Sequence, residues 1–335
     1  MPEVRIPMVD KPTVISLFAG CGGSSLGYQM AGFRELLAVE WDDNAVQTFR
    51  LNFPEVPVYH GDIAKLTGKE CMKLAGIQKG ELDVLDGSPP CQGFSTAGKR
   101  RFTDPRNSLF QEYARLLTDL QPKVFVLENV TGMVKGCMKQ AYLEIMRTLR
   151  GCGYKAKGEV LNAMYFNVPQ SRERVIIIGV REDLGIEPSH PKPQGRPTIL
   201  RECIWDLRGN REDDRMLSPI IQKVAKKQPH RWSTDVRIYM SIKGNQGSSL
   251  TLKWADWDGV CMTIIQDERA LTGIVHPDRE RYISLREAQR IAGFPDTFRF
   301  TDRSNGMKRV GNTVPPPLMK AIAEHIRDNI LAVQL

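Results

Sequence analysis

Short apolar runs alternate with amphipathic segments through the first half of the chain. The run TVISLFAG (13–20) is rich in β-branched residues, and the segment CGGSSLGYQMAG after it begins with glycines and continues with larger side chains at helical spacing. Further apolar runs lie at 35–40, 56–62, 82–88, 123–130 and 174–180, with helix-length segments such as 110–120 and 141–149 between several of them. Strands that alternate with helices predict an α/β fold with a doubly wound, mainly parallel sheet.

Residues suited to binding or catalysis lie at the ends of these predicted strands. They are Gly20, Glu40, Asp62, the triplet Pro89-Pro90-Cys91, and Glu128. Open parallel sheets bind their ligands at the carboxyl ends of the strands. The sequence therefore predicts that one array of strand ends forms one site.

The pattern changes after Val180. From Arg181 to about Arg279 the chain is rich in Pro, Arg, Lys, Asp and Trp, and short strand-like runs are joined by Gly, Asn and Ser turns. A helical segment (284–295) follows, and the apolar pattern of 316–335 predicts a last helix that packs on the first domain. We predict a larger domain from 1–180 plus about 305–335, and a smaller, irregular β-rich domain over about 181–304. Trp232, Trp254 and Trp257 are interpreted as core residues of the smaller domain.

Composition adds a weak preference for a polyanionic partner. The 335 residues carry a formal charge of +8 and the pI is about 9.1, which suits phosphate contacts but also fits a protein that is merely basic. The seven cysteines show no paired CxxC or histidine spacing for zinc, so we expect no metal. The odd cysteine count without a secretory signal predicts free thiols in the cytoplasm, and no run approaches the ~20 apolar residues of a membrane span.

The glycine turn FAGCGG (18–23) and two acids predict a nucleotide-type site. Glycines let backbone amides approach an anionic group at a helix N-terminus. Glu40 ends the next strand about twenty residues later, a position that suits a ribose hydroxyl, and Asp62 can accept from an adenine amino group. The alternative is that either acid is a helix cap or a solvated turn residue.

The segment GSPPCQGFSTAGKR (87–100) is more specific. Two prolines fix the chain before Cys91, and glycines with a basic pair follow in a loop that can close over nucleic acid. A thiol on a rigid strand end is placed to attack a substrate. The alternative is a buried, inert cysteine near a turn.

Several motifs together resemble the DNA (cytosine-5) methyltransferase family, in its bacterial or phage modification form. They are FAGCGG, the Pro-Cys segment, ENV (128–130), QSRER (170–174), REAQRIAGFPD (286–296) and GNTVPPPLMKAI (311–322), in the family's order. The resemblance covers nearly the whole chain except roughly 181–279. It implies the class I S-adenosylmethionine-dependent methyltransferase fold, with the larger domain catalytic and the smaller one recognising the target.

The resemblance implies four catalytic residues. Cys91 would add to carbon 6 of cytosine, and Glu128, as a protonated acid, would donate to ring nitrogen 3. Arg172 would support the site and Arg174 would donate to the cytosine carbonyl oxygen. A buried apolar strand that runs into Glu128 is unusual for a surface acid, and alternation in RERV places both arginines on one strand face. The alternative for the arginines is a charged run that enters a strand.

The resemblance also implies S-adenosyl-L-methionine as cofactor and S-adenosyl-L-homocysteine as product. Phe18 would stack on the adenine, Gly20 and Gly22 would lie beside the methionine part, and Glu40 would bind the ribose. The remaining implied cofactor contacts are Trp41, Asp62, Ile63, Pro90 and, from near the C-terminus, Asn312.

The implied substrate is double-stranded DNA, from which the target cytosine must be flipped out because the reacting atoms are buried in a stacked duplex. We expect a monomer without added reader domains and no membrane association. The enzyme would act with or without a restriction endonuclease, and such a partner would act on the same DNA site without a stable complex. One alternative is the branch of the family that methylates tRNA, and another is a non-catalytic DNA-binding relative. The recognition sequence and the base that removes the carbon-5 proton are not specified by the sequence.

Overall fold

The computed structural model describes residues 11–90, 108–134, 139–209, 215–219, 222–223, 226, 253–266 and 273–334. Its main feature is a seven-stranded sheet in the order β3-β2-β1-β4-β5-β8-β6. The strands are β1 (Thr13–Leu17), β2 (Arg34–Glu40), β3 (Val58–His60), β4 (Val84–Gly87), β5 (Val124–Val130), β6 (Tyr154–Asn162) and β8 (Glu173–Arg181). β1 to β5 pair in parallel, whereas β8 is antiparallel to both β5 and β6. The predicted doubly wound, mainly parallel sheet is confirmed.

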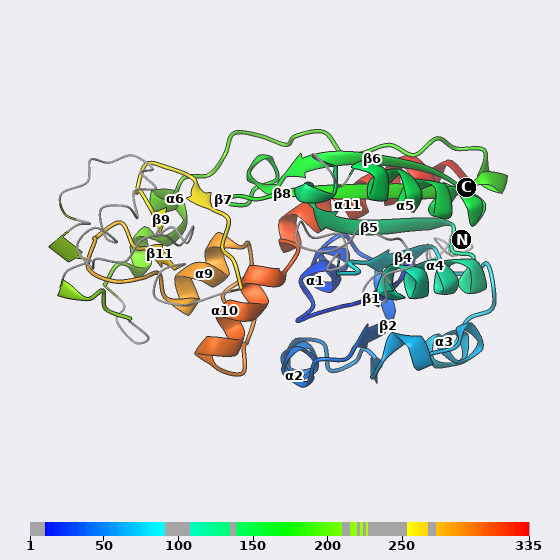
Figure 1. Cartoon of the computed structure of the whole chain (residues 1–335), viewed down its shortest axis with the longest axis horizontal. Coiled ribbons are helices and arrows are strands. Elements are labelled where there is room, and N and C mark those ends of the chain that lie inside the picture. Colours follow the sequence, from blue (N-terminus) through cyan, green and yellow to red (C-terminus); the bar gives the residue numbers. More distant parts are fainter. Residues whose placement is uncertain are drawn as a thin grey trace, which may run out of the picture.

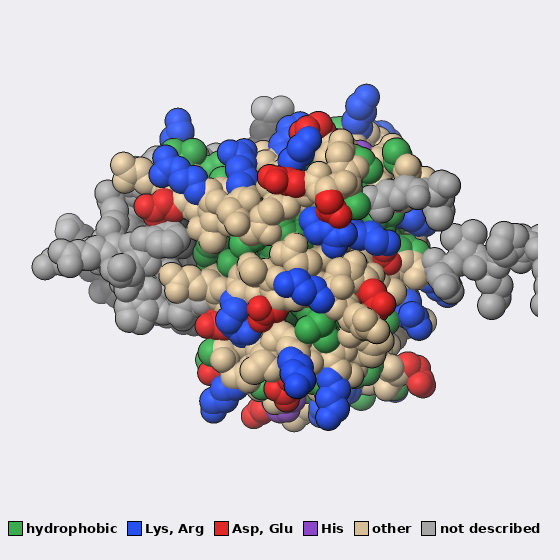
Figure 2. All heavy atoms as spheres, turned by 90° about the vertical axis from the view of Figure 1, so that its right-hand side faces the viewer, with side chains coloured by type: hydrophobic (Ala, Val, Ile, Leu, Met, Phe, Trp, Pro, Cys, Tyr) green, Lys and Arg blue, Asp and Glu red, His purple; other side chains and the backbone are tan. Residues whose placement is uncertain are grey.

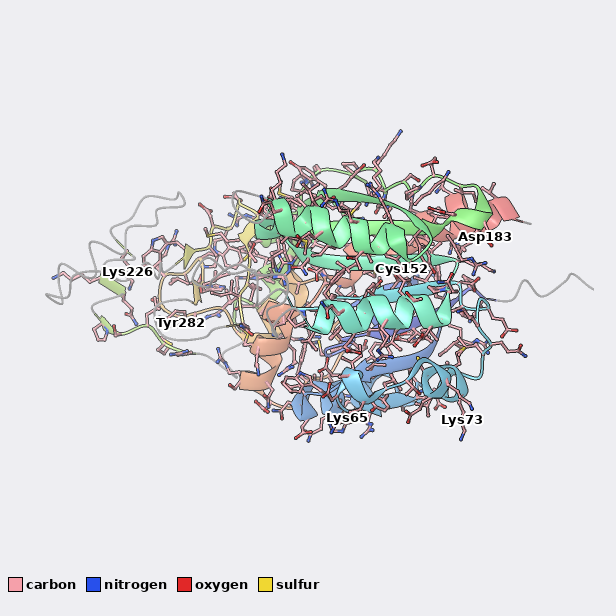
Figure 3. All side chains as sticks on the ribbon, turned by 45° about the vertical axis from the view of Figure 1, so that its right-hand side comes forward. Lys65, Lys73, Cys152, Asp183, Lys226 and Tyr282 are labelled. Carbon is pink, nitrogen blue, oxygen red and sulfur yellow. The ribbon has the colours of Figure 1, made fainter. Side chains whose placement is uncertain are left out.

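Helices cover both faces of this sheet (Figure 1). The helices are α1 (Gly23–Met30), α2 (Asp43–Asn52), α3 (Gly68–Ala75), α4 (Ser108–Leu120), α5 (Lys139–Gly151) and α11 (Pro316–Ile326). α3, α4 and α5 bury their apolar stripes in one core, and α1 and α11 bury theirs in a second core across the sheet. Figure 3 shows α4 and α5 side by side over one face, with Cys152 just after α5.

The C-terminal helix packs on the first helix, as the sequence predicted. A Cβ atom on Gly27 of α1 would lie 2.5 Å from the Cβ of Met319 on α11, so the two helices touch backbone to side chain. Gly23 is even closer to Thr313, since a Cβ there would lie 1.8 Å from the threonine Oγ1. The end of the chain is therefore part of the same packed unit as its beginning.

One strand was missed by the sequence analysis. β6 (Tyr154–Asn162, YKAKGEVLN) has no apolar run, because it is an edge strand whose residues are partly exposed. It pairs along its whole length with β8, whose apolar residues Val175–Val180 are buried between β5 and β6. An edge strand needs apolar residues on one face only, so its signal in the sequence is weak.

The region after β8 contains short elements. They are α6 (Leu200–Ile204), β9 (Lys253–Trp254), β10 (Cys261–Met262), β11 (Ile274–Val275), α9 (Leu285–Ile291) and α10 (Arg303–Asn312). The short strand β7 (Gln170–Ser171), which lies just before β8, pairs with β10. A third core joins this region to α2, because Phe49 and Phe53 lie in one cluster with Ile291 and Met307. Trp254 is buried and Trp257 packs against that cluster, which agrees with their interpretation as core, while Trp232 lies outside the described residues. The proposed domain boundaries stay a prediction.

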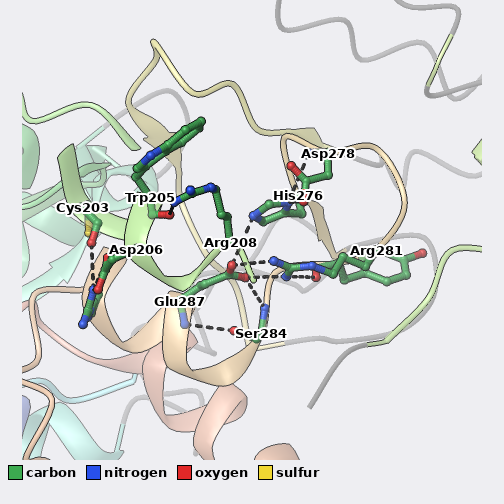
Figure 4. Close-up of polar contacts among 11 residues, drawn as sticks. Cys203, Trp205, Asp206, Arg208, His276, Asp278, Arg281, Ser284 and Glu287 are labelled. Atoms are coloured by element: carbon green, nitrogen blue, oxygen red, sulfur yellow. Dashed lines mark hydrogen bonds and ion pairs between the residues drawn. The ribbon is translucent and has the colours of Figure 1, made fainter. Parts of the chain in front are cut away.

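A buried polar network organises this smaller region (Figure 4). Arg281 donates to both carboxylate oxygens of Glu287 at 2.7 Å, and Ser284 and Glu287 form a capping box at the start of α9. His276 Nε2 lies 3.2 Å from the same carboxylate. Although burial opposes it, hydrogen bonds from Arg281 and His276 hold the pKa of Glu287 at about 2. The network fixes α9 against the strand segments before it.

The end of the sheet away from the smaller region carries mixed charge. Figure 2 faces that end and shows Lys and Arg interspersed with Asp and Glu. Lys123 pairs with Asp83 at 2.7 Å and Arg181 with Asp183 at 2.7 Å, so charges of both signs neutralise each other there. None of the helices in the described part of the chain is long and apolar enough to cross a membrane. The same residues contain no cluster of His, Cys, Asp or Glu that could hold a metal ion.

Candidate active site

The glycine turn after β1 combines one open glycine with tightly packed ones. Phe18, Gly20 and Gly22 all have positive φ angles, of 57°, 58° and 95°. A Cβ on Gly20 would meet no atom within 4 Å, whereas one on Gly22 would lie 2.3 Å from the ring of Phe53. Packing and backbone conformation thus account for Gly22, and Gly20 offers open space next to backbone amides where a ligand can approach.

Glu40 connects this turn to the end of β2. Its Oε2 accepts from the backbone N–H of Gly20 at 2.8 Å, and its Oε1 accepts from those of Trp41 and Asp42 at 2.9 Å each. The side chain is 8% exposed. Three backbone donors fix the orientation of the Glu40 carboxyl group at the edge of the open space.

Three other predicted cofactor contacts lie at the ends of β2 and β3. The Trp41 side chain is 76% exposed. Asp62 is exposed and caps the short helix Ile63–Lys65 through a 3.0 Å bond from Ala64 N, which is the alternative considered for this acid. Ile63 is buried in the core that Phe18 contacts. The structure thus places Phe18, Glu40, Trp41, Asp62 and Ile63 on neighbouring strand ends.

The strand that leads to Cys91 is tied to the next strand by a residue to which the sequence analysis gave no role. Asn129 Nδ2 donates to the carbonyl oxygen of Pro89 at 3.0 Å, and both residues are buried. Asn129 Oδ1 accepts from Val130 N at 2.8 Å, which fixes the amide orientation. Pro90 is exposed, and Cys91 lies outside the described residues. In the sequence, only the position of Asn129 next to Glu128 in the ENV motif pointed to a role for it.

Glu128 and Arg174 form a buried ion pair. Arg174 Nε lies 2.7 Å from Glu128 Oε1, and Glu128 is 8% exposed on β5. Burial raises the pKa of Glu128, and the opposing charges of Arg174 and Arg172 reduce that rise without cancelling it. Burial therefore favours the protonated form of this carboxyl group more than in water, as suits a group that donates a proton.

Arg172 lies close to this pair, but its side chain bonds other segments of the chain. It is 1% exposed, and it donates to the backbone carbonyls of Ile264 at 3.0 Å and Gly311 at 2.9 Å. Burial lowers the pKa of Arg172, yet a guanidinium stays protonated at neutral pH. The structure therefore brings both arginines to Glu128, with Arg174 in contact and Arg172 bonded to distant backbone.

Asn312 comes to the same end of the sheet from the far end of the chain. It is the last residue of α10 and is exposed, and the next residue, Thr313, packs on Gly23 at the start of α1. Arg309 of α10 also pairs with Asp42, after β2, at 3.0 Å. These contacts bring the end of α10 to the glycine turn, and the cofactor contact of Asn312 stays a prediction.

Three cysteines of the described residues are poor nucleophiles. Burial raises the pKa of Cys21, Cys71 and Cys203 to about 12 each. A thiol with such a pKa carries almost no thiolate at neutral pH. Cys21, although it lies in the glycine turn, therefore fits the inert, structural role.

Comparison with known proteins identifies the family. The family model described as C-5 cytosine-specific DNA methylase matches residues 12–328. The chain is 33% identical to the type II methyltransferase M.XorII of Xanthomonas oryzae pv. oryzae, over 95% of this chain and 85% of that protein. It is 35% identical to the type II methyltransferase M1.HphI of Haemophilus parahaemolyticus, over 94% and 86% of the two chains.

Solved structures agree with this assignment. A chain described as a DNA modification methyltransferase encoded within an Escherichia coli prophage superposes with a TM-score of 0.75 at 26% identity, covering 96% of this chain and all of that one. The Dnmt2 methyltransferase of S. pombe, at 17% identity and a TM-score of 0.64, shares the fold over 97% of this chain. The family model spans nearly the whole chain and relatives above 30% identity cover most of it, so this protein belongs to the C-5 cytosine-specific DNA methylases and is a DNA (cytosine-5) methyltransferase.

Proposed function

We propose that the protein transfers a methyl group from S-adenosyl-L-methionine to carbon 5 of a cytosine flipped out of double-stranded DNA, through a covalent adduct on Cys91. The observation that carries this proposal is the buried Glu128–Arg174 pair beside the Pro89 carbonyl that Asn129 holds. The pair supports the proposal because burial raises the pKa of Glu128, and the next residue, Asn129, bonds the segment that leads directly to Cys91.

Covalent addition makes cytosine reactive at carbon 5. The Cys91 thiolate adds to carbon 6, and the electron pair of the carbon 5–carbon 6 bond moves into the ring toward nitrogen 3, where a proton must arrive. Glu128 is suited to donate that proton, because burial raises the pKa of its carboxyl group. After methyl transfer, the carbon-5 proton is lost, the thiolate leaves, and nitrogen 3 returns its proton to the Glu128 carboxylate, which restores the aromatic ring.

Arg174 is suited to bind the cytosine carbonyl oxygen. Its Nε holds Glu128 and its Nη1 bonds the Glu173 carbonyl at 2.7 Å, so the guanidinium is fixed before substrate arrives. A preorganised donor stabilises negative charge that develops on the ring without having to reorient.

The residues around the glycine turn fit S-adenosyl-L-methionine, which when bound supplies an electrophilic methyl group on a sulfonium. The open space over Gly20 admits a ligand to the backbone, and the Glu40 carboxylate at its edge suits a ribose diol. The exposed face of Trp41 offers a stacking surface for adenine. Phe18, Gly22, Asp62, Ile63, Pro90 and Asn312 complete the proposed set.

The proposed setting is bacterial or phage DNA modification. The protein would act as a monomer in the cytoplasm, and a restriction endonuclease would act on the same DNA site without forming a stable complex with it. The names of the type II relatives support this setting. The region from about 181 to 304 would recognise the target sequence through base-edge and phosphate contacts.

The first test uses methyl-labelled S-adenosyl-L-methionine with either unmethylated duplex DNA or tRNA. We expect label in the DNA, and bisulfite sequencing of DNA from an expressing host then identifies the product and the target sequence. Label that enters tRNA alone would contradict the proposed substrate and favour the tRNA-methylating branch of the family.

The covalent step has its own test. DNA that contains 5-fluorocytosine should trap the protein as a stable adduct, because fluorine at carbon 5 cannot leave as a proton does. We expect the adduct to vanish in Cys91→Ala and to persist in Cys152→Ala, which changes a half-buried thiol elsewhere. Full methyl transfer by Cys91→Ala would refute the mechanism, and the absence of any adduct from the unaltered protein would favour a non-catalytic DNA-binding protein.

A further inference from the structure

The Arg172 side chain joins two segments that lie far from it in sequence. Its Nη1 donates to the carbonyl of Ile264 and its Nη2 to the carbonyl of Gly311, at 3.0 and 2.9 Å. The planar guanidinium presents its donors in a fixed fork, so it can hold two carbonyls at a set separation, whereas the donors of lysine rotate and all lie on one nitrogen. Since a buried charge is costly unless it is hydrogen-bonded, both bonds must form for the residue to remain at 1% exposure.

The same three segments also meet through their backbones. β10 pairs with β7, Cys261 N donates to the Pro169 carbonyl at 3.0 Å, and Thr263 Oγ1 donates to the Ser171 carbonyl at 2.7 Å. On the other side, a Cβ on Gly311 would lie 2.3 Å from Gln266 N, so the end of α10 presses directly on the backbone of 265–266. We name residues 169–172, 261–266 and 311–312 the three-segment clasp.

Each arm of the clasp leads to a different part of the proposed reaction. Residues 169–172 continue into Arg174, which contacts Glu128. Residues 261–266 belong to the region proposed to recognise DNA. Residues 311–312 include Asn312, the proposed cofactor contact beside the glycine turn. A shift of any arm stretches a bond to Arg172 or a contact at Gly311, so the positions of the three arms are energetically linked.

We propose that Arg172 is a positioning residue that couples the occupancy of the cofactor site at Asn312 to the placement of the DNA-recognition segment 261–266. This inference rests on the proposed function, and it assigns Arg172 an action through backbone position and none through contact with cytosine. By thermodynamic linkage, DNA then tightens cofactor binding by the same factor by which cofactor tightens DNA binding.

The test measures the dissociation constant of S-adenosyl-L-homocysteine by calorimetry, without DNA and with saturating plasmid DNA that the unaltered enzyme methylates. The ratio of the two constants is the coupling factor, and we expect at least about fivefold for the unaltered protein. Arg172→Lys breaks the two-carbonyl bridge, and Thr263→Val removes one bond of the clasp with little change in volume. Both should bring the ratio toward one.

Matched controls lie elsewhere on the fold. Arg181, at the other end of β8, also donates to two carbonyls, those of Gly80 and Gln121. A Cβ on Gly151 would meet nothing within 4 Å. Arg181→Lys and Gly151→Ala should therefore keep the ratio of the unaltered protein.

The outcomes separate the two proposals. A ratio of one in the unaltered protein, or an unchanged ratio in Thr263→Val, overturns the coupling role, and Thr263→Val decides the matter if Arg172→Lys does not fold. An unaltered protein that transfers no methyl group to any DNA refutes the proposed function instead.

Discussion

Glu40 and Glu128 stand at equivalent places in the sheet but in opposite surroundings. Each is 8% exposed and each lies at the carboxyl end of a parallel strand. Glu40 accepts hydrogen bonds from three backbone N–H groups, whereas Glu128 has the ion pair with Arg174 in a site where burial is the largest influence on its pKa. At equal burial, one acid is thus fixed by backbone hydrogen bonds, whereas burial raises the pKa of the other.

The difference arises from what each strand end faces. The backbone turns sharply after β1 and β2, which directs amide groups at Glu40. Glu128 lies two residues before the end of β5, where the backbone still pairs with β8, and its carboxyl group pairs with the Arg174 side chain of β8. Two acids with such different surroundings should respond differently to the same change, and each prediction below uses that contrast.

The largest effect is expected for Glu128→Gln. Glutamine keeps the shape and can donate a hydrogen bond to nitrogen 3, but it has no proton to transfer. We expect kcat for methyl transfer to DNA to fall by roughly a hundredfold to ten-thousandfold, while the dissociation constant of S-adenosyl-L-homocysteine stays unchanged. The matched control Glu159→Gln, on the partly exposed strand β6, should keep full activity.

The pH dependence of kcat sharpens the same contrast. The active form of Glu128 is protonated, and burial raises its pKa, so kcat should decline as pH rises through that pKa. Arg174→Met removes a charge that lowers the pKa of Glu128, so the decline should move to higher pH even as the maximal rate falls. A decline at unchanged pH in Arg174→Met would show that a different group sets it.

Glu40→Gln should have the opposite effect to Glu128→Gln, weakening cofactor binding and leaving kcat nearly unchanged. The amide places an NH2 group against backbone N–H donors, so at least one charge-assisted hydrogen bond is lost, at about 1.5–3 kcal/mol. We expect cofactor to bind roughly tenfold to a hundredfold more weakly, with kcat at saturating cofactor nearly retained. Glu55→Gln, an exposed acid after α2, serves as control. A loss confined to kcat would remove the distinction between the two acids.

Trp41→Ala tests whether the exposed Trp41 side chain, next to Glu40, contacts the adenine of the cofactor. Because the Trp41 side chain is 76% exposed, its removal should change the free energy of unfolding by no more than about 0.5 kcal/mol. Loss of a stacking surface for adenine costs about 1–3 kcal/mol, so cofactor should bind roughly tenfold more weakly. Trp205→Ala, in the smaller region, should leave cofactor binding unchanged. Equal cofactor affinity in both variants would exclude Trp41 from the site.

The sequence predicted the parts of this contrast that depend on local signals. Apolar runs located the parallel strands, and Glu40 and Glu128 could be assigned to the carboxyl ends of two of them. The sequence analysis did not predict β6, because an edge strand carries only a weak apolar pattern. The role of Cys91 and the boundaries of the smaller domain stay predictions.

Long-range contacts were beyond the sequence for a physical reason. Arg172 bonds carbonyls 92 and 139 residues away, and Asn129 bonds one 40 residues away. Such backbone acceptors have no residue-type signature, so no spacing rule reveals them. Gly22 is the opposite case. Its place in the glycine turn predicted a ligand contact, but the motif gave no sign that Gly22 packs against Phe53.

A third acid, Asp86, extends the comparison and should give the smallest effect, on stability alone. It lies on β4, 4% exposed, on the same sheet face as Glu128, and its Oδ1 accepts from Tyr28 at 3.4 Å. Burial, and then the neighbouring acids Glu35 and Glu128, raise the pKa of Asp86 to about 8, against hydrogen bonds from Ser24 and Tyr28 that lower it. In the unfolded chain the same carboxyl group ionises near pH 4.

Between those two pKa values the folded protein binds one more proton at Asp86 than the unfolded chain, so this group reduces stability progressively as pH rises from about 4 to 8. Asp86→Asn removes that dependence, because the amide does not titrate and still accepts a hydrogen bond. We expect the unfolding midpoint of Asp86→Asn, relative to the unaltered protein, to be higher by a few degrees at about pH 9 and by less at about pH 5. Asp83→Asn instead breaks the ion pair to Lys123 and should lower the midpoint at both pH values. A difference for Asp86→Asn that is the same at both pH values would mean that Asp86 is ionised in the folded protein, and Glu128 would then lie beside a fixed negative charge.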